Sequence, residues 1–210
     1  MKPIIFSTEM VQKILSGDKS QTRRVVKIPS WTWDKFDDLK HVNGRLLANS
    51  RKTRAMSLIN PPYAVGDVLW VRETYCNNGR YPMHGIGGSC YKADCRNGED
   101  YCEDYSEENH DDCRTRKWKP AIHMPKDAAR IFLRVTGVRA ERLQDVTESD
   151  AQCEGVYPLI IGDLPDNLEE SHVAAFSVLW EELNADRGYG WDKNPWVWVI
   201  EFERCEKPSA

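Results

Sequence analysis

One short stretch, GDKSQTRR at residues 17–24, follows a predicted helix and gathers a lysine, a threonine and two arginines. Lys19 and Thr22 lie three positions apart, and Gly17 can adopt the backbone angles of a sharp turn. An amine and a hydroxyl group at this spacing can act together on one small ligand. The alternative is a basic turn in solvent. Taken alone, so short a pattern more often indicates this alternative.

The size and composition of the chain predict one globular domain over residues 1–210. Its 210 residues are 40% hydrophobic and 30% charged, which fits a packed protein and not a disordered one. No apolar run approaches the roughly 20 residues of a membrane helix, and the run near the N-terminus is too short for a signal peptide. We therefore expect a cytoplasmic protein with no membrane partner. The sequence does not indicate an oligomeric state.

The net charge of −4 is unevenly distributed along the chain. Residues 1–60 hold 12 Lys and Arg against 5 Asp and Glu, whereas residues 92–113 hold 2 against 9. A basic N-terminal third can attract phosphate, but the chain as a whole is too acidic to coat a nucleic acid. The charge pattern therefore favours a nucleotide or a short RNA segment as the anionic partner.

Hydrophobic periodicity predicts four strands and three helices. The expected strands cover residues 3–6, 67–74, 130–139 and 196–203. The first expected helix begins at Ser7 or Thr8 and ends at Gly17. The other two cover residues 147–155 and 168–183. Residues 28–64 are expected to be an irregular insertion or a hairpin, and residues 76–117 a long surface insertion. This order predicts an α+β protein with a small mixed or antiparallel sheet, which can curl into a barrel with helices at its rim.

Four blocks in this order resemble the ASCH domain family. They are G-x-K-x-x-T-x-R at residues 17–24, G-D-V-L at 66–69, E-R-L-x-x-V-T-x-x-x-A-x-x-E-G at 141–155, and W-V-I-E-F at 198–202. The resemblance implies a PUA-like fold, a small curled β-barrel with flanking helices around a cleft. The sequences W-V-R-E-T and K-P-x-I-H-M-P are similar to those of ASCH proteins encoded by phages and prophages.

One branch of that family removes the acetyl group from N4-acetylcytidine. The resemblance implies that Lys19, Thr22 and Glu154 match the catalytic lysine, threonine and glutamate of this branch. The present chain is about twice as long as those enzymes, because of the two expected insertions. Either insertion can narrow, widen or cover the cleft.

Hydrolysis of an amide needs a nucleophile, a base and a proton for the leaving amine. Thr22 offers the hydroxyl group. Lys19 can act as the base if burial and the neighbouring arginines lower its pKa, and Glu154 can then carry the proton to the leaving nitrogen. Alternatively, Glu154 pairs with Lys19 and keeps it charged, so that the lysine orients the substrate or stabilises an oxyanion. Taken alone, Glu154 is more often an ordinary exposed carboxylate near a helix end, and the resemblance makes the two interpretations about equal.

A second set of residues is expected to bind the substrate. The set consists of Arg23, Arg24, Trp70, Arg72, Glu73 and Trp118. Arg24 can contact a phosphate or a base edge, or pair with a carboxylate. For Glu73 a salt bridge between strands is the favoured alternative, and for Trp70 it is packing in the core. Trp118 lies between two lysines, a combination that suits base stacking.

Seven cysteines are present, four of them at positions 90, 95, 102 and 113. The odd total and the lack of an export signal indicate that disulfides are not the main covalent support. The four contain no C-x-x-C pair and fit zinc sites poorly, so we expect neither a metal nor a cofactor; a structural zinc ion in the insertion is the less favoured alternative. The expected function is an amidohydrolase acting on a non-peptide C–N bond of a modified nucleoside. The alternatives are a non-catalytic binder of RNA or a modified base, and a phage accessory protein whose acidic insertion binds a host protein.

Overall fold

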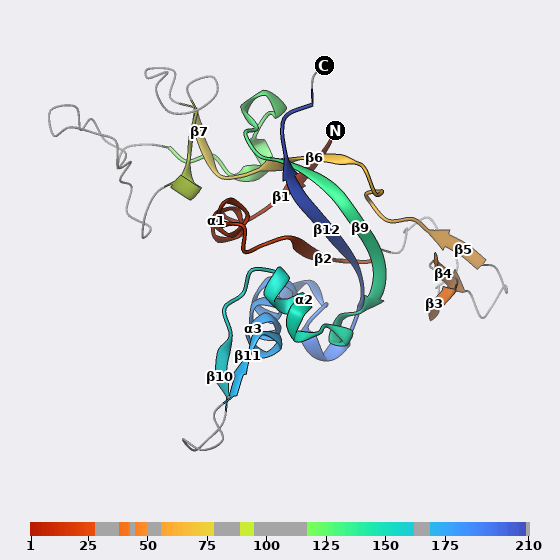
Figure 1. Ribbon diagram of the computed structural model, residues 1–210. Coiled ribbons are helices and arrows are strands. Elements are labelled where there is room, and N and C mark those ends of the chain that lie inside the picture. The colour runs from red at the N-terminus through yellow and green to blue at the C-terminus, as the bar shows by residue number, and fades with distance from the viewer. Residues whose placement is uncertain are drawn as a thin grey trace, which may run out of the picture. The chain divides into compact units, whose positions relative to one another are not determined.

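The computed structural model describes residues 1–27, 38–42, 45–49, 56–77, 89–94, 117–161 and 169–208 (Figure 1). The chain divides into two compact units. Unit 1 contains residues 1–17, 67–134 and 203–210, and unit 2 contains residues 18–66 and 135–202. The expectation of one domain over residues 1–210 stays a prediction, because two compact units can belong to one domain.

Unit 1 begins with strand β1 (Lys2–Ile5) and helix α1 (Thr8–Ser16). The Oγ atom of Ser7 accepts a hydrogen bond from the Met10 amide and caps the helix, as predicted. Gly17 ends the helix in the left-handed conformation, with φ 89°, and its amide donates to the Ile14 carbonyl. Strand β1 pairs in parallel with β6 (Val68–Arg72), which pairs antiparallel with the first residues of β9 (Phe132–Arg142).

The rest of unit 1 consists of short elements around an aromatic core. Strands β7 (Tyr75–Asn77) and β8 (Ser89–Tyr91) form an antiparallel pair, followed by the short helices η2 (Lys92–Asp94), η6 (Ala121–His123) and η7 (Lys126–Ala128). The core of this unit consists of Trp70, Tyr75, Tyr91, Met124, Ala128, Ala129 and Phe132.

Unit 2 combines paired strands with two helices. Strand β2 (Gln21–Val25) pairs antiparallel with β12 (Trp196–Cys205), from Val197 opposite Val25 to Glu201 opposite Gln21. Helices α2 (Glu148–Cys153) and α3 (His172–Asn184) pack against each other (Figure 1). The unit also contains the hairpin of β10 (Leu159–Ile161) and β11 (Glu169–Ser171) and the turns η8 (Leu143–Asp145), η10 (Ala185–Arg187) and η11 (Trp191–Lys193).

Apolar residues from the strands and from both helices form the core of unit 2. They are Leu143, Val146, Ala151, Phe176, Trp180, Val197 and Val199. On strand β12 the alternate residues Trp198, Ile200 and Phe202 are buried as well. Successive residues of a strand point to opposite faces, so β12 is covered on both faces, which explains its continuous apolar sequence.

The expected insertion at residues 28–64 contains regular structure. Strands β3 (Asp38–Val42), β4 (Arg45–Asn49) and β5 (Met56–Ile59) form an antiparallel three-stranded sheet. The expectation of an irregular segment or a single hairpin was therefore wrong for the described part of this segment. Most of the second insertion, residues 76–117, lies outside the described residues.

The mixed α+β class is confirmed. The main sheet has the strand order β1-β6-β9-β12-β2, with β9 and β12 contributing residues to both units. Within the described ranges this order does not close into a barrel, and no helix there is long and apolar enough to cross a membrane.

One expectation about local structure needs correction. The last helix begins at His172 and not at residue 168, because residues 169–171 pair with β10 first. Pairing within this hairpin overrides the local helical pattern. The stretch at residues 17–24 continues into the largely buried strand β2, which does not fit the alternative of a solvated turn.

Removing the helix cap at Ser7 should destabilise the fold measurably. We expect Ser7→Ala to lower the free energy of unfolding by about 1 kcal/mol, because the Met10 amide loses its acceptor. Ser7→Asp, which keeps an acceptor, should lose much less. Urea unfolding followed by tryptophan fluorescence measures both variants, and equal losses in the two would contradict the assigned cap.

Candidate functional site

Strand β2 positions the candidate site through the alternation of its side chains. Gln21 and Arg23 point to one face of the strand, and Thr22 and Arg24 to the other. The face of Arg23 lies toward helix α2, since Arg23 contacts Glu154 at the end of that helix. The two arginines that the sequence placed together therefore point in opposite directions.

Lys19 and Glu154 form a buried ion pair, although 135 positions separate them in the sequence. The Nζ atom of Lys19 donates to the Oε2 atom and to the backbone carbonyl of Glu154, both at 2.8 Å. The side chains of Lys19 and Glu154 are only 1% and 4% exposed. A backbone bridge also joins the two residues, and the Ser20 amide donates to the Cys153 carbonyl. Side chains and backbone together hold the lysine against the end of α2.

The position of Glu154 follows from the limits of helix α2. Thr147 caps the start of the helix by accepting from the Asp150 amide, as the sequence predicted. The helix ends at Glu154, and Gly155 follows with φ 81°. A carboxylate at a helix C-terminus is opposed by the helix dipole. The nearby cations offset this cost, so Glu154 is not the exposed helix-end carboxylate of the alternative interpretation.

Arg23 is the second cation on Glu154, and its side chain is completely buried. Its Nη1 atom donates to Glu154 Oε1 at 3.2 Å, and its Nη2 atom donates to Glu141 Oε1 at 2.6 Å and lies 3.4 Å from Asp150 Oδ2. The guanidinium group also lies 5.5 Å from the centroid of the Phe176 ring. These contacts engage Arg23 inside unit 2.

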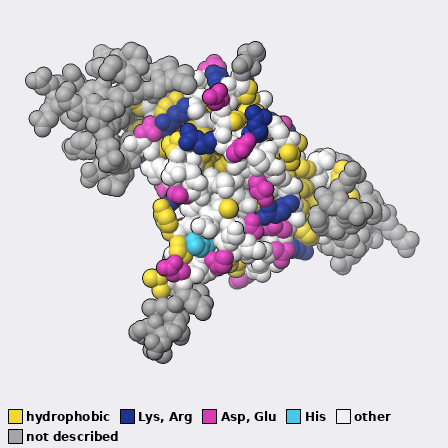
Figure 2. All heavy atoms as spheres, in the orientation of Figure 1, with side chains coloured by type: hydrophobic (Ala, Val, Ile, Leu, Met, Phe, Trp, Pro, Cys, Tyr) yellow, Lys and Arg dark blue, Asp and Glu magenta, His cyan; other side chains and the backbone are white. Residues whose placement is uncertain are grey.

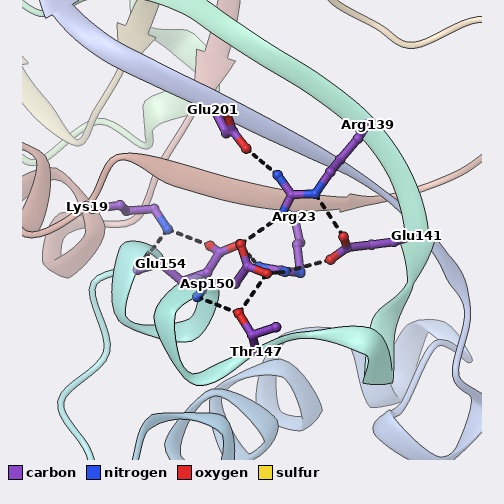
Figure 3. A network of polar contacts seen from close by, with 8 residues as sticks. All are labelled: Lys19, Arg23, Arg139, Glu141, Thr147, Asp150, Glu154 and Glu201. Atoms are coloured by element: carbon purple, nitrogen blue, oxygen red, sulfur yellow. Dashed lines mark hydrogen bonds and ion pairs between the residues drawn. The ribbon is translucent and has the colours of Figure 1, made fainter. Parts of the chain in front are cut away.

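The ion pairs continue outward from Arg23 through Arg139 (Figure 3). Arg139 donates to Glu141 Oε2 at 2.9 Å, to Asp150 Oδ1 at 2.7 Å and to Glu201. A side chain at position 137 would meet the end of the Glu201 side chain, which is 44% exposed and would have to move aside. The network of Figure 3 thus joins three cations to four carboxylates, and Glu154 is the carboxylate that pairs with Lys19.

Burial sets the electrostatics of the site. It lowers the pKa of Lys19 below the ordinary value of 10.5, because the ammonium group loses its hydration. Glu154 acts in the opposite direction, and the charges of Arg24 and Arg23 lower the pKa further. Burial also lowers the pKa of Arg24, whereas the nearby Glu154 raises it. The neutral form of Lys19 is therefore more accessible than that of a lysine in water.

Thr22 is buried but lies apart from the ion pair. It is paired with Ile200 across β2 and β12, and its side chain points to the face opposite Arg23. Among the described residues, its hydroxyl group makes no hydrogen bond with Lys19 or Glu154. The convergence expected from the sequence is thus present for the amine and the carboxylate, and for Thr22 it stays a prediction.

The other expected binding residues belong to unit 1. Trp70 is 8% exposed and packs in the aromatic core, as the alternative interpretation held. The Arg72 guanidinium lies 5.3 Å from the Trp70 ring centroid, and its Nε atom donates to the Met124 carbonyl at 3.1 Å. Trp118 is partly buried.

Glu73 forms a salt bridge, but not the expected one between strands, because neither Glu73 nor its partner Arg130 lies in a strand. Its two carboxylate oxygens each accept a hydrogen bond of 3.0 Å from Arg130, which also donates to Asp94 at 2.8 Å. Burial raises the pKa of Glu73, and Arg130 opposes this rise. The side chain of Glu73 is only 1% exposed. Its carboxylate therefore has a structural partner within unit 1.

Sequence reasoning missed several members of the site. The missed residues lie on β9, α2 and β12; they are Arg139, Glu141, Asp150 and Glu201. The available signal in the sequence was the period-two alternation of a strand, which places Arg139 and Glu141 on one face. Gln21 was missed too, although it shares the face of Arg23. Its Nε2 atom is buried and has no hydrogen-bond partner among the described residues.

No cluster of His, Cys, Asp and Glu in the described ranges could hold a metal ion. Three of the four cysteines weighed as zinc ligands, at positions 95, 102 and 113, lie outside those ranges.

Comparisons with known proteins add no relative. No protein-family model matches the chain, and no similar curated protein or solved structure was found. The description of the site therefore rests on its own geometry.

Removing the Glu154 carboxylate should destabilise the protein strongly. We expect Glu154→Ala to lower the free energy of unfolding by about 3–5 kcal/mol, because it leaves the buried Lys19 and Arg23 without a shared carboxylate. Glu203→Ala is the control: its carboxylate is 62% exposed and lies 3.9 Å from Arg134, so we expect a loss below about 1 kcal/mol. Chemical denaturation measures both, and similar losses would refute the central role of Glu154.

The lowered pKa of Lys19 has a consequence with a definite sign. Between its pKa in the folded protein and its unfolded value near 10.5, the unfolded state binds more protons, so stability rises with pH. We expect wild type to gain stability relative to Lys19→Met as the pH increases over this range. Paired denaturation curves at several pH values check this. A constant difference between the two proteins would show that burial does not perturb Lys19.

Proposed function

We propose that the protein is an ASCH-like, PUA-like protein that binds a modified nucleoside and hydrolyses an N-acyl amide on its base, as in N4-acetylcytidine. The observation that carries the proposal is the buried ion pair of Lys19 and Glu154. The resemblance assigned catalytic roles to these two residues before their proximity was known. The order of motifs along the sequence supports the family and the curled barrel.

The chemistry uses the pair as one proton-transfer unit. The nucleophile gives its proton to the neutral Nζ atom of Lys19, whose pKa burial lowers toward the range of a useful base. Glu154 lies within hydrogen-bond distance of Nζ at 2.8 Å, so a proton can pass from the lysine to the carboxylate and on to the leaving nitrogen. The C–N bond breaks as the nitrogen takes the proton.

Thr22 is the proposed nucleophile, on the strength of the resemblance. Its oxygen would bond to the acyl carbon, and water would then release the acid and restore the hydroxyl group. This step requires the substrate to reach Thr22 on one face of β2 and the Lys19–Glu154 pair on the other.

Binding without catalysis is the second candidate, and a specific observation favours it. Both carboxylate oxygens of Glu154 already accept hydrogen bonds, one from Lys19 and one from Arg23, which suits a structural ion pair. Long nucleic acid is not favoured as the ligand, since basic and acidic side chains of the described residues are interspersed on the face drawn in Figure 2. A host protein that binds the acidic insertion stays a prediction, because that segment lies largely outside the described residues.

Turnover of N4-acetylcytidine tests the proposal. Chromatography would follow the release of cytidine and acetate by wild type and by Lys19→Met, Thr22→Val and Glu154→Gln. We expect each substitution to reduce kcat/KM by about 10²- to 10⁴-fold, the usual contribution of a positioned acid, base or nucleophile. Glu203→Gln, at an exposed position, should retain wild-type activity.

The binding experiment separates the two candidates. Equilibrium dialysis would measure the affinity of wild type for N4-acetylcytidine, for cytidine and for a short RNA at several salt concentrations. Binding without turnover would favour the second candidate, and a steep salt dependence would point to RNA. Full activity in Thr22→Val would remove Thr22 from the mechanism. If wild type showed no turnover and no binding, both candidates would be overturned.

A further inference from the structure

Two cysteines face each other across the short hairpin ladder of unit 1. In the antiparallel pairing of β7 with β8, Cys76 is directly opposite Cys90. Both residues are present as thiols, and both are buried, at 5% and 8% exposure. Cys76 lies outside the group of cysteines that the sequence suggested as zinc ligands, so sequence reasoning did not connect it with Cys90.

The hydrogen bonds of neighbouring residues fix the geometry of this pair. The amide and the carbonyl of Tyr75 both bond to Lys119, so they point away from β8. Backbone groups alternate along an antiparallel strand, so those of Cys76 point toward β8 and Cys90. Opposite residues in such a hydrogen-bonded pair have Cα atoms about 5.5 Å apart. That separation lies inside the disulfide range of about 4.4–6.8 Å.

The same geometry makes such a bond a strained one. Opposite side chains in a sheet have Cβ atoms about 4.5–5.5 Å apart, whereas a disulfide prefers about 3.5–4.5 Å. Closing the bond must draw the two strands together locally. A strained disulfide is reduced more easily than a structural one, which suits reversible formation.

We propose that Cys76 and Cys90 are a redox modification site, at which the two thiols form a reversible disulfide by exchange with a small-molecule disulfide. One thiolate attacks the small disulfide and forms a mixed disulfide, releasing one small thiol. The other cysteine then displaces the second small thiol and closes the Cys76–Cys90 bond. The protein loses two electrons and two protons, and one small disulfide becomes two thiols.

The disulfide would draw together two strands of unit 1 that lie next to the aromatic core and to the ion pair of Arg130 with Glu73. Tyr75 and Tyr91, the next pair along the ladder, both pack in the aromatic core. The Tyr91 ring lies 3.9 Å from the Arg130 guanidinium, which holds the buried Glu73 carboxylate. Oxidation at Cys76 and Cys90 therefore acts one residue away from the contacts that fix Glu73. This proposal uses no residue of the Lys19–Glu154 site and stands independently of the proposed function.

Peptide mapping of the full chain tests the proposal, because trypsin separates the two cysteines. Cleavage after Arg72, Arg80 and Lys92 yields peptides 73–80 and 81–92, each with one cysteine. The protein would be treated with oxidised glutathione, alkylated with iodoacetamide and digested without reduction. We expect a linked pair of these peptides, lighter than their sum by two hydrogen atoms, and a matching loss of both alkylated forms. Dithiothreitol should restore the alkylated forms.

The controls use the other cysteines. Cys76→Ser and Cys90→Ser should each abolish the linked pair, whereas Cys153→Ser and Cys205→Ser should retain it. The measurement on the unchanged chain does not depend on how the variants fold. Alkylated forms that persist after oxidation would overturn the proposal. A glutathione adduct without the link would overturn it too, as would a link from either peptide to Cys95, Cys102 or Cys113.

Discussion

The structure of unit 2 depends on placing two cations, Lys19 and Arg23, beside one carboxylate away from water. Each of these charges loses its hydration on folding, and Glu154 is in contact with both cations. The end of α2 must therefore lie against the start of β2, and the backbone bridge between Lys19 and Glu154 fixes that junction. Helix α3 then adds Phe176 over Arg23, which connects the ion pairs to the apolar core.

The ion pair of Lys19 and Glu154 is structural in the fold and catalytic in the proposed function, and these two roles have opposite requirements. A structural pair is most stable when Lys19 keeps its proton and Glu154 keeps its charge. A catalytic pair needs the proton to move. Burial lowers the pKa of Lys19 against the pull of Glu154, so the energy difference between the charged and the neutral arrangement is smaller than in water. This balance makes the same two residues plausible in an enzyme and in a binding protein.

Much of the architecture was predictable because it depends on local patterns. Ser7 and Thr147 accept from amides three residues ahead, and Gly17 and Gly155 adopt left-handed angles that favour glycine. The continuous apolar run of β12 similarly predicts a strand from its own sequence. Strand β2 was not predictable in this way, because Lys19 and the threonine and arginines that follow it resemble a solvent-exposed turn when taken locally. Only pairing with β12 and contact with α2 bury them.

By itself, the sequence determined which chemical groups are present, the caps and glycines that bound helices α1 and α2, and the strongly apolar strands such as β12, since caps, glycines and periodicity act over a few residues. The tertiary structure decided which groups meet. It brought Glu154 to Lys19, directed Thr22 to the opposite face of its strand, engaged Glu73 with Arg130 and set Cys76 opposite Cys90. The reason is physical: strand pairing and the burial of charge depend on residues far apart in the sequence, and no local pattern records the partner.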